Sequence, residues 1–110
     1  MNIQFRDSAG VTVVAVAGKL DALTAANYET TMKALLADGK TRCVVDFSEL
    51  TYISSAGLRV LLAAAKSTKA AGGETRFAGV TGNVLAVIEM TGFNSILSLH
   101  DSVDAALGAM

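Results

Sequence analysis

The chain has 110 residues, of which 52% are hydrophobic and 17% are charged, and its basic and acidic residues leave a formal net charge of −1. This length fits one domain, spanning residues 1–110, and the apolar content provides for a hydrophobic core and argues against disorder. Because both signs of charge are scattered and no basic run occurs, nucleic acid is a poor candidate for a partner.

The first expected elements are two strands joined by a turn. Residues 2–6 alternate polar and apolar, with Ile3 and Phe5 on one side, which is typical of a half-exposed strand. Residues 7–10 are rich in turn formers, and the apolar run Val11–Ala17 indicates a more deeply buried strand. We expect the two strands to form a hairpin.

A helix and a buried strand are expected next. Either Asp21 or Thr24 is suited to cap the helix, and Gly39 is suited to end it. Apolar residues follow at the spacing i, i+4, i+7 and i+8, which places on one helix face Tyr28, Met32, Leu35 and Leu36. The run Arg42–Phe47 lacks a clean alternation, as expected of a parallel strand covered on both faces.

The remaining chain continues the alternation of helices and strands. After a loop we expect a helix over residues 55–71, a strand over Thr75–Gly79, a helix over Asn83–Thr91 that Gly92 ends, and a short strand over Ile96–Leu99. Asp101 is suited to cap a last helix. The order predicts an α/β fold: a mostly parallel central sheet, an antiparallel edge strand at Ile3–Arg6 and about four helices.

Two loops stand out as candidate functional segments, because function in open α/β sheets gathers at the carboxyl ends of the strands. They are Gly18–Asp21 and Asp46–Gly57. Within the second loop, Ser54 and Ser55 precede the expected helix and permit two interpretations. Both serines serve only to cap the helix, or one caps while the other faces solvent as a phosphoacceptor. The residues alone do not choose between these interpretations.

Three motifs resemble those of one known family. The stretch Tyr52–Leu62, with Asp46–Ser48 before it, resembles the signature of the STAS domain, which anti-sigma factor antagonists share with the cytoplasmic tails of sulfate transporters. Gly18–Asp21 is similar to the family's Gly-x-Leu-Asp loop, and Glu89–Phe93 is similar to its closing Thr-Gly element. The resemblance extends over nearly the whole chain, which favours a stand-alone antagonist over a transporter tail.

The resemblance implies a function and a site. In this family the unphosphorylated antagonist binds an anti-sigma factor that is also a serine kinase, the kinase ends the complex by phosphorylating a serine, and a phosphatase restores it. That serine corresponds to Ser55, and Ser54 stands where many members have Asp. The implied partner-binding residues are Asp21, Ser54, Ser55, Ala56, Gly57 and Leu58. Asp21 either acts on the Ser55 hydroxyl or its phosphate, or simply caps a turn.

The alternative function is a constitutive scaffold or transport-accessory subunit that uses the same surface without phosphorylation. An enzyme is not expected, because the only histidine, His100, lies far from Ser55 in the sequence and no nucleophile motif surrounds that serine. No cofactor and no metal are expected either. The exposed first strand allows a monomer or a weak homodimer.

The sequence also indicates a cytoplasmic location. No stretch reaches the roughly 18 consecutive apolar residues of a membrane span, and Met1–Gln4 lacks the features of a signal peptide. Cys43 is the only cysteine, so neither a disulfide within the chain nor a cysteine metal cluster can form. Within an apolar run it is expected to be a buried, inert thiol.

Overall fold

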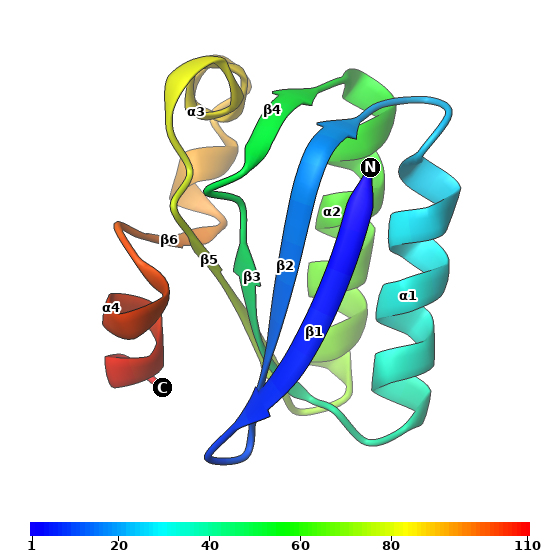
Figure 1. The fold of residues 1–110 in the computed structure, drawn as a ribbon, viewed down its shortest axis with the longest axis vertical. Coiled ribbons are helices and arrows are strands. Elements are labelled where there is room, and N and C mark those ends of the chain that lie inside the picture. The colour runs from blue at the N-terminus through cyan, green and yellow to red at the C-terminus, as the bar shows by residue number, and fades with distance from the viewer.

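A six-stranded sheet forms the centre of the computed structural model, which describes residues 1–110 (Figure 1). Its strands are β1 (Asn2–Ser8), β2 (Val11–Leu20), β3 (Arg42–Asp46), β4 (Leu50–Ile53), β5 (Glu74–Ala78) and β6 (Ser98–His100). The helices are α1 (Ala25–Ala37), α2 (Ser55–Ala70), α3 (Gly82–Met90), α4 (Val103–Gly108) and the 3-10 turn η1 (Phe93–Ser95). The strand order is β1-β2-β3-β5-β6, and β4 pairs with β2 outside this path.

The edge of the sheet is the predicted antiparallel hairpin. Ser8 pairs with Val11, so the turn consists of only Ala9 and Gly10. Both turn residues have positive φ, 51° and 84°, which is the backbone of a type I′ turn and matches the twist of the flanking strands. All other strand pairs in the sheet are parallel. The prediction of a mostly parallel sheet with an antiparallel edge pair and four helices is therefore confirmed.

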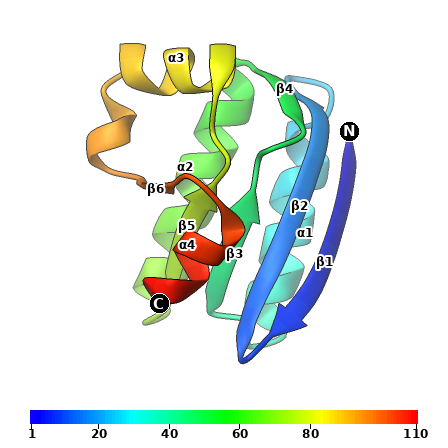
Figure 2. The same ribbon diagram turned by 60° about the vertical axis from the view of Figure 1, so that its left-hand side comes forward.

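The two faces of the sheet are covered unequally. Helices α1 and α2 lie on one face, and the short α4 lies on the other, in front of β3 and β5 (Figure 2). Alternate residues of β2 accordingly enter different cores: Val14 and Val16 join the large cluster of 18 residues, and Val11 and Val13 join the small cluster of five. Residues of β3 are buried on both faces, as its lack of alternation predicts. Neither α2 nor any other helix combines the length and apolar character that a membrane crossing requires.

Two predictions about local structure were wrong. Residues 50–53 were expected to be loop but form β4, which pairs with the end of β2 beyond the reach of β3. In β4 the buried Leu50 and Ile53 are separated by two exposed residues, and the register with β2 shifts at Gly18/Lys19, so no period of two is visible. The cap of α4 is Ser102, whose Oγ accepts from the Ala105 amide at 3.1 Å, and not Asp101.

The thiol of Cys43 lies in the large core, where burial raises its pKa and its Sγ donates only a weak hydrogen bond, 3.6 Å long, to the Lys40 carbonyl. A raised pKa keeps the sulfur protonated and unreactive at neutral pH. The prediction that Cys43 is buried is therefore confirmed, and its raised pKa is consistent with an inert thiol.

Candidate functional site

The loops that follow β2 and β4 meet at one end of the sheet, where α1 and α2 begin (top of Figure 1). The amide of Ser54 donates to the carbonyl of Leu20 at 2.9 Å, so the start of α2 is attached directly to the last residue of β2. Asp21 is the next residue along the chain. The structure thus brings together the two segments that the sequence singles out, 18–21 and 46–57.

The contact between these two segments depends on Gly57. A Cβ atom at this position would overlap the Leu20 carbonyl oxygen and would lie 2.9 Å from Leu20 Cγ. Only a residue without a side chain permits the first turn of α2 to approach the backbone of β2 this closely. Gly57 and the neighbouring Leu58 are both buried, so these two predicted site residues support the surface from beneath.

The two serines differ in their surroundings. Ser54 is the N-cap of α2, with extended backbone (φ −97°, ψ 174°), and its Oγ accepts from the Gly57 amide at 3.2 Å. Ser55 is the first residue of the helix; its side chain is exposed, and its hydroxyl makes no hydrogen bond within the protein. The capping interpretation therefore holds for Ser54, whereas it does not account for Ser55.

Asp21 caps the turn that leads into α1. Its Oδ1 accepts from the amides of Leu23 and Thr24 at 3.0 and 3.2 Å, and from the Thr24 hydroxyl at 3.2 Å. Partial desolvation raises the pKa of Asp21, but these hydrogen bonds and the charge of Lys19 outweigh it, so the pKa is lowered and the side chain is an anion at neutral pH. Of the two residues suited to cap the helix, Thr24 occupies the N-cap position, but its side chain accepts from the Asp21 amide and not from a helix amide.

An open groove of about 280 Å³ begins at Ser55 and runs between α2 and the segment containing α3 and η1. Its lining is mostly apolar and consists of Ser55, Leu58, Arg59, Leu62, Val87, Thr91 and Phe93. Gly92, with φ 76°, ends α3 and turns the chain so that the partly buried Phe93 packs against the core. The Thr-Gly motif near residue 91 therefore shapes one wall of this groove.

Sequence reasoning missed three exposed apolar side chains. Leu23 and Met90, which are 88% and 83% exposed, lie on the β2–α1 loop and at the end of α3, and Tyr52 of β4 is 44% exposed. They lie on the elements that flank the start of α2, and exposed apolar area of this kind is used in protein interaction where it forms a continuous patch. The only signal in the sequence was that none of the three fits the apolar period of its element, and that signal is weak.

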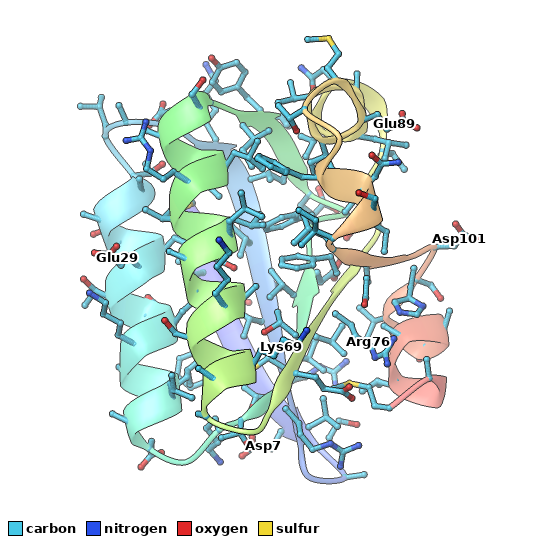
Figure 3. All side chains as sticks on the ribbon, turned by 180° about the vertical axis from the view of Figure 1, so that it is seen from behind. Asp7, Glu29, Lys69, Arg76, Glu89 and Asp101 are labelled. Atoms are coloured by element: carbon cyan, nitrogen blue, oxygen red, sulfur yellow. The ribbon has the colours of Figure 1, made fainter.

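The only histidine of the chain is not among the residues of the candidate site. The ring of His100 is 3.2 Å from Arg76, whose side chain lies between β5 and α4 (Figure 3), so His100 is engaged elsewhere. No group of three or more His, Cys, Asp and Glu side chains converges anywhere in the chain. What the site offers is a surface with a free serine hydroxyl, a carboxylate and an apolar groove.

The family model of the STAS domain matches residues 2–106 of this chain. A protein of Bordetella bronchiseptica named as an anti-sigma factor antagonist, BtrV, is 35% identical over 100 residues, which cover 91% of this chain and 86% of that protein.

Solved structures show the same fold. An anti-sigma factor antagonist from Mycobacterium paratuberculosis has a TM-score of 0.87 at 28% identity, over 98% of this chain and 92% of that one. A structure from Thermotoga maritima described in the same terms has a TM-score of 0.91 at 18% identity, over 97% and 92% of the two chains. Bacillus SpoIIAA in its phosphorylated form has a TM-score of 0.75 at 16% identity, over 99% of this chain and 100% of that one.

Proposed function

This chain belongs to the STAS domain family, and we propose that it is an anti-sigma factor antagonist controlled by phosphorylation of Ser55. In the proposed cycle the unphosphorylated chain binds an anti-sigma factor that is also a serine kinase. Phosphorylation of Ser55 ends the complex, and a serine phosphatase acting on the phosphorylated form restores it. The role is one of binding, not catalysis, and such partners place the chain in the cytoplasm.

The observation that carries the proposal is the free hydroxyl of Ser55 at the mouth of the apolar groove. A kinase needs an accessible hydroxyl, and Ser55 is exposed whereas Ser54 is half-buried with its oxygen occupied by the Gly57 amide. Relatives named anti-sigma factor antagonists and the phosphorylated form of SpoIIAA support a modification of this kind.

The surroundings of Ser55 give a physical reason why a phosphate there would end binding. Phosphorylation adds about −1.5 to −2 charges at neutral pH. A partner that covers the groove would have to desolvate this charge beside a mostly apolar lining, which is costly. The carboxylate of Asp21, held by the turn after β2, adds a second negative charge at the same end of the sheet.

The proposed docking surface includes the predicted residues and the apolar side chains around them. Asp21, Ser54, Ser55 and Ala56 contribute its polar centre, with Gly57 and Leu58 beneath. Leu23, Tyr52 and Met90 flank this centre on three different elements and provide exposed apolar area. We expect the substitutions Leu23→Asp and Met90→Asp to weaken binding of the anti-sigma factor at least tenfold without changing the unfolding temperature.

Phosphorylation is tested with the cognate kinase and ATP, by mass spectrometry of the intact chain. The proposal expects the parent protein and Ser54→Ala to gain one phosphate each, and Ser55→Ala to gain none. An unchanged mass of the parent protein under conditions where the kinase is active on a model substrate would refute the switch. A phosphate on the Ser54 side chain would move the site by one residue.

The alternative, a constitutive scaffold or transport-accessory subunit, predicts a different effect of charge at this surface. The same fold occurs in the murine anion transporter Slc26a9, with a TM-score of 0.79 over 93% of this chain and 18% of that one. Under the alternative, Ser55→Asp leaves partner binding nearly intact, whereas under the proposed switch it removes most of it. Calorimetry with Ser55→Asp, and with Ser55→Asn as the uncharged control of similar size, separates the two functions.

A further inference from the structure

Arg59 is the one basic residue in the groove lining that begins at Ser55. It is exposed on α2, and its guanidinium has no partner: the ion pairs of the chain are made by Lys33, Lys40 and Arg76. Arg59 follows Ser55 by four residues, a spacing that places two side chains one above the other on the same face of a helix. Side chains in a helix also lean toward its N-terminus, which directs Arg59 back toward Ser55.

We propose that Arg59 pairs with the phosphate on Ser55 and holds it along α2 at the mouth of the groove. This inference rests on the proposed phosphorylation of Ser55. The planar guanidinium donates in a geometry that suits two phosphate oxygens at once, which a lysine ammonium does not reproduce. Arg59 is then a positioning residue: it fixes the phosphate where it covers the docking groove, and it favours the doubly charged form.

The carboxylates of Asp21 and Glu89 do not compete with the phosphate for Arg59. The carboxylate of Asp21 is occupied by amides and a hydroxyl of its own turn. Val87 and Thr91, four residues apart, present one face of α3 to the groove, so Glu89, two residues from each, lies on the opposite face. Figure 3 shows Glu89 on the side of α3 that is turned away from α2.

Lys19 is the competing cation. It is exposed on β2 and pairs in register with Tyr52, three residues before Ser55 in the sequence. The charge of Lys19 contributes to the lowered pKa of Asp21, so the Lys19 ammonium lies close enough to the turn after β2 to act on it. A test of Arg59 therefore has to include the removal of Lys19.

The test uses the full chain with phosphoserine installed at position 55 during synthesis, so that no kinase is involved. The phosphorus NMR signal is followed across the second phosphate ionisation, near pH 6. At a fixed pH in this range we expect the ratio of dianion to monoanion to be about twofold higher in the parent than in Arg59→Gln, as an ion pair at this helical spacing implies. Arg59→Lys should retain part of the effect, and Lys19→Gln should titrate like the parent.

The inference is overturned if Arg59→Gln titrates like the parent, or if Lys19→Gln produces the larger change. Because Arg59 is exposed and unpaired, the unmodified Arg59→Gln protein should unfold at the parent's temperature, which separates a lost phosphate contact from a damaged fold. Failure of the proposed function would look different: the kinase would leave Ser55 unmodified, while the titration of the synthetic phosphoprotein would be unaffected.

Discussion

Gly57→Ala tests the close approach on which the site is built. Alanine is preferred over glycine inside a helix by up to about 1 kcal/mol, so at an unobstructed position this substitution would stabilise α2. The added Cβ overlaps the Leu20 carbonyl oxygen, however, and backbone has to move to accept it. Overpacking of this kind typically costs about 1–3 kcal/mol. The same shift would strain the Ser54–Leu20 hydrogen bond of 2.9 Å.

We therefore expect Gly57→Ala to lose about 1–3 kcal/mol of unfolding free energy, or about 4 °C of Tm per kcal/mol in a domain of this size. Urea unfolding followed by circular dichroism measures the loss. Gly108→Ala is the matched control, because nothing lies within 4 Å of a Cβ at that helical position, and it should be neutral or stabilising. A Gly57→Ala protein as stable as the parent would refute the close approach, since the sign of the effect depends on that contact.

Three further predictions concern stability. Ser54→Ala removes the N-cap acceptor of the Gly57 amide and should lower the free energy of urea unfolding by about 1 kcal/mol. Ser55→Ala should change this free energy by less than about 0.5 kcal/mol. Equal losses would contradict the division of roles between the two serines. The hydrogen bond and the charge of Lys40 lower the pKa of Asp7 in the folded protein. The pair therefore stabilises the fold at pH values above the pKa of Asp7 in the unfolded chain, about 3.9, and this stabilisation is lost as the pH falls through the lower pKa of the folded protein. NMR titration should show that the pKa of Asp7 rises in Lys40→Gln, and an unchanged pKa would exclude the pair. Phe77 is 1% exposed, and the centre of its ring lies 5.7 Å from that of Phe47. Phe77→Ala should therefore lower the free energy of unfolding by about 3–5 kcal/mol, measured by thermal unfolding. A loss below about 1 kcal/mol would mean that the core closes around the cavity.

The candidate site shows how far sequence reasoning reached. The two loops were identified because the carboxyl ends of parallel strands share one edge of a sheet, a rule that needs only the order of the elements. The distinction between Ser54 and Ser55 was left open by the residues and was suggested only by the resemblance to the STAS family. The backbone supplies a physical distinction, since one serine lies just before the helix with its oxygen turned to the Gly57 amide, and the other lies in the first turn with its oxygen in solvent.

The parts that sequence reasoning missed share one cause. β4 was taken for loop because Leu50 and Ile53 are buried by an irregular pairing with the far half of β2, which leaves no alternation to read. The groove beside Ser55 was missed because its walls come from α2 and from a segment about thirty residues later in the chain. The exposure of Leu23 and Met90 was missed because it depends on which segments the fold packs against them.

Local properties of the chain, then, were sufficient for every strand except β4 and for the order of the helices. Glycines mark where helices stop, an apolar run marks the strand covered on both faces, and turn formers over residues 7–10 mark the hairpin. These depend on the residue and its near neighbours, so the sequence by itself determined the α/β class and the antiparallel edge, and it pointed to the two loops that form the candidate site. The surface at the start of α2 was decided only by tertiary contact. Exposure, the path of the groove and the absence of a partner for Arg59 depend on which distant segments pack together, and no local pattern encodes that.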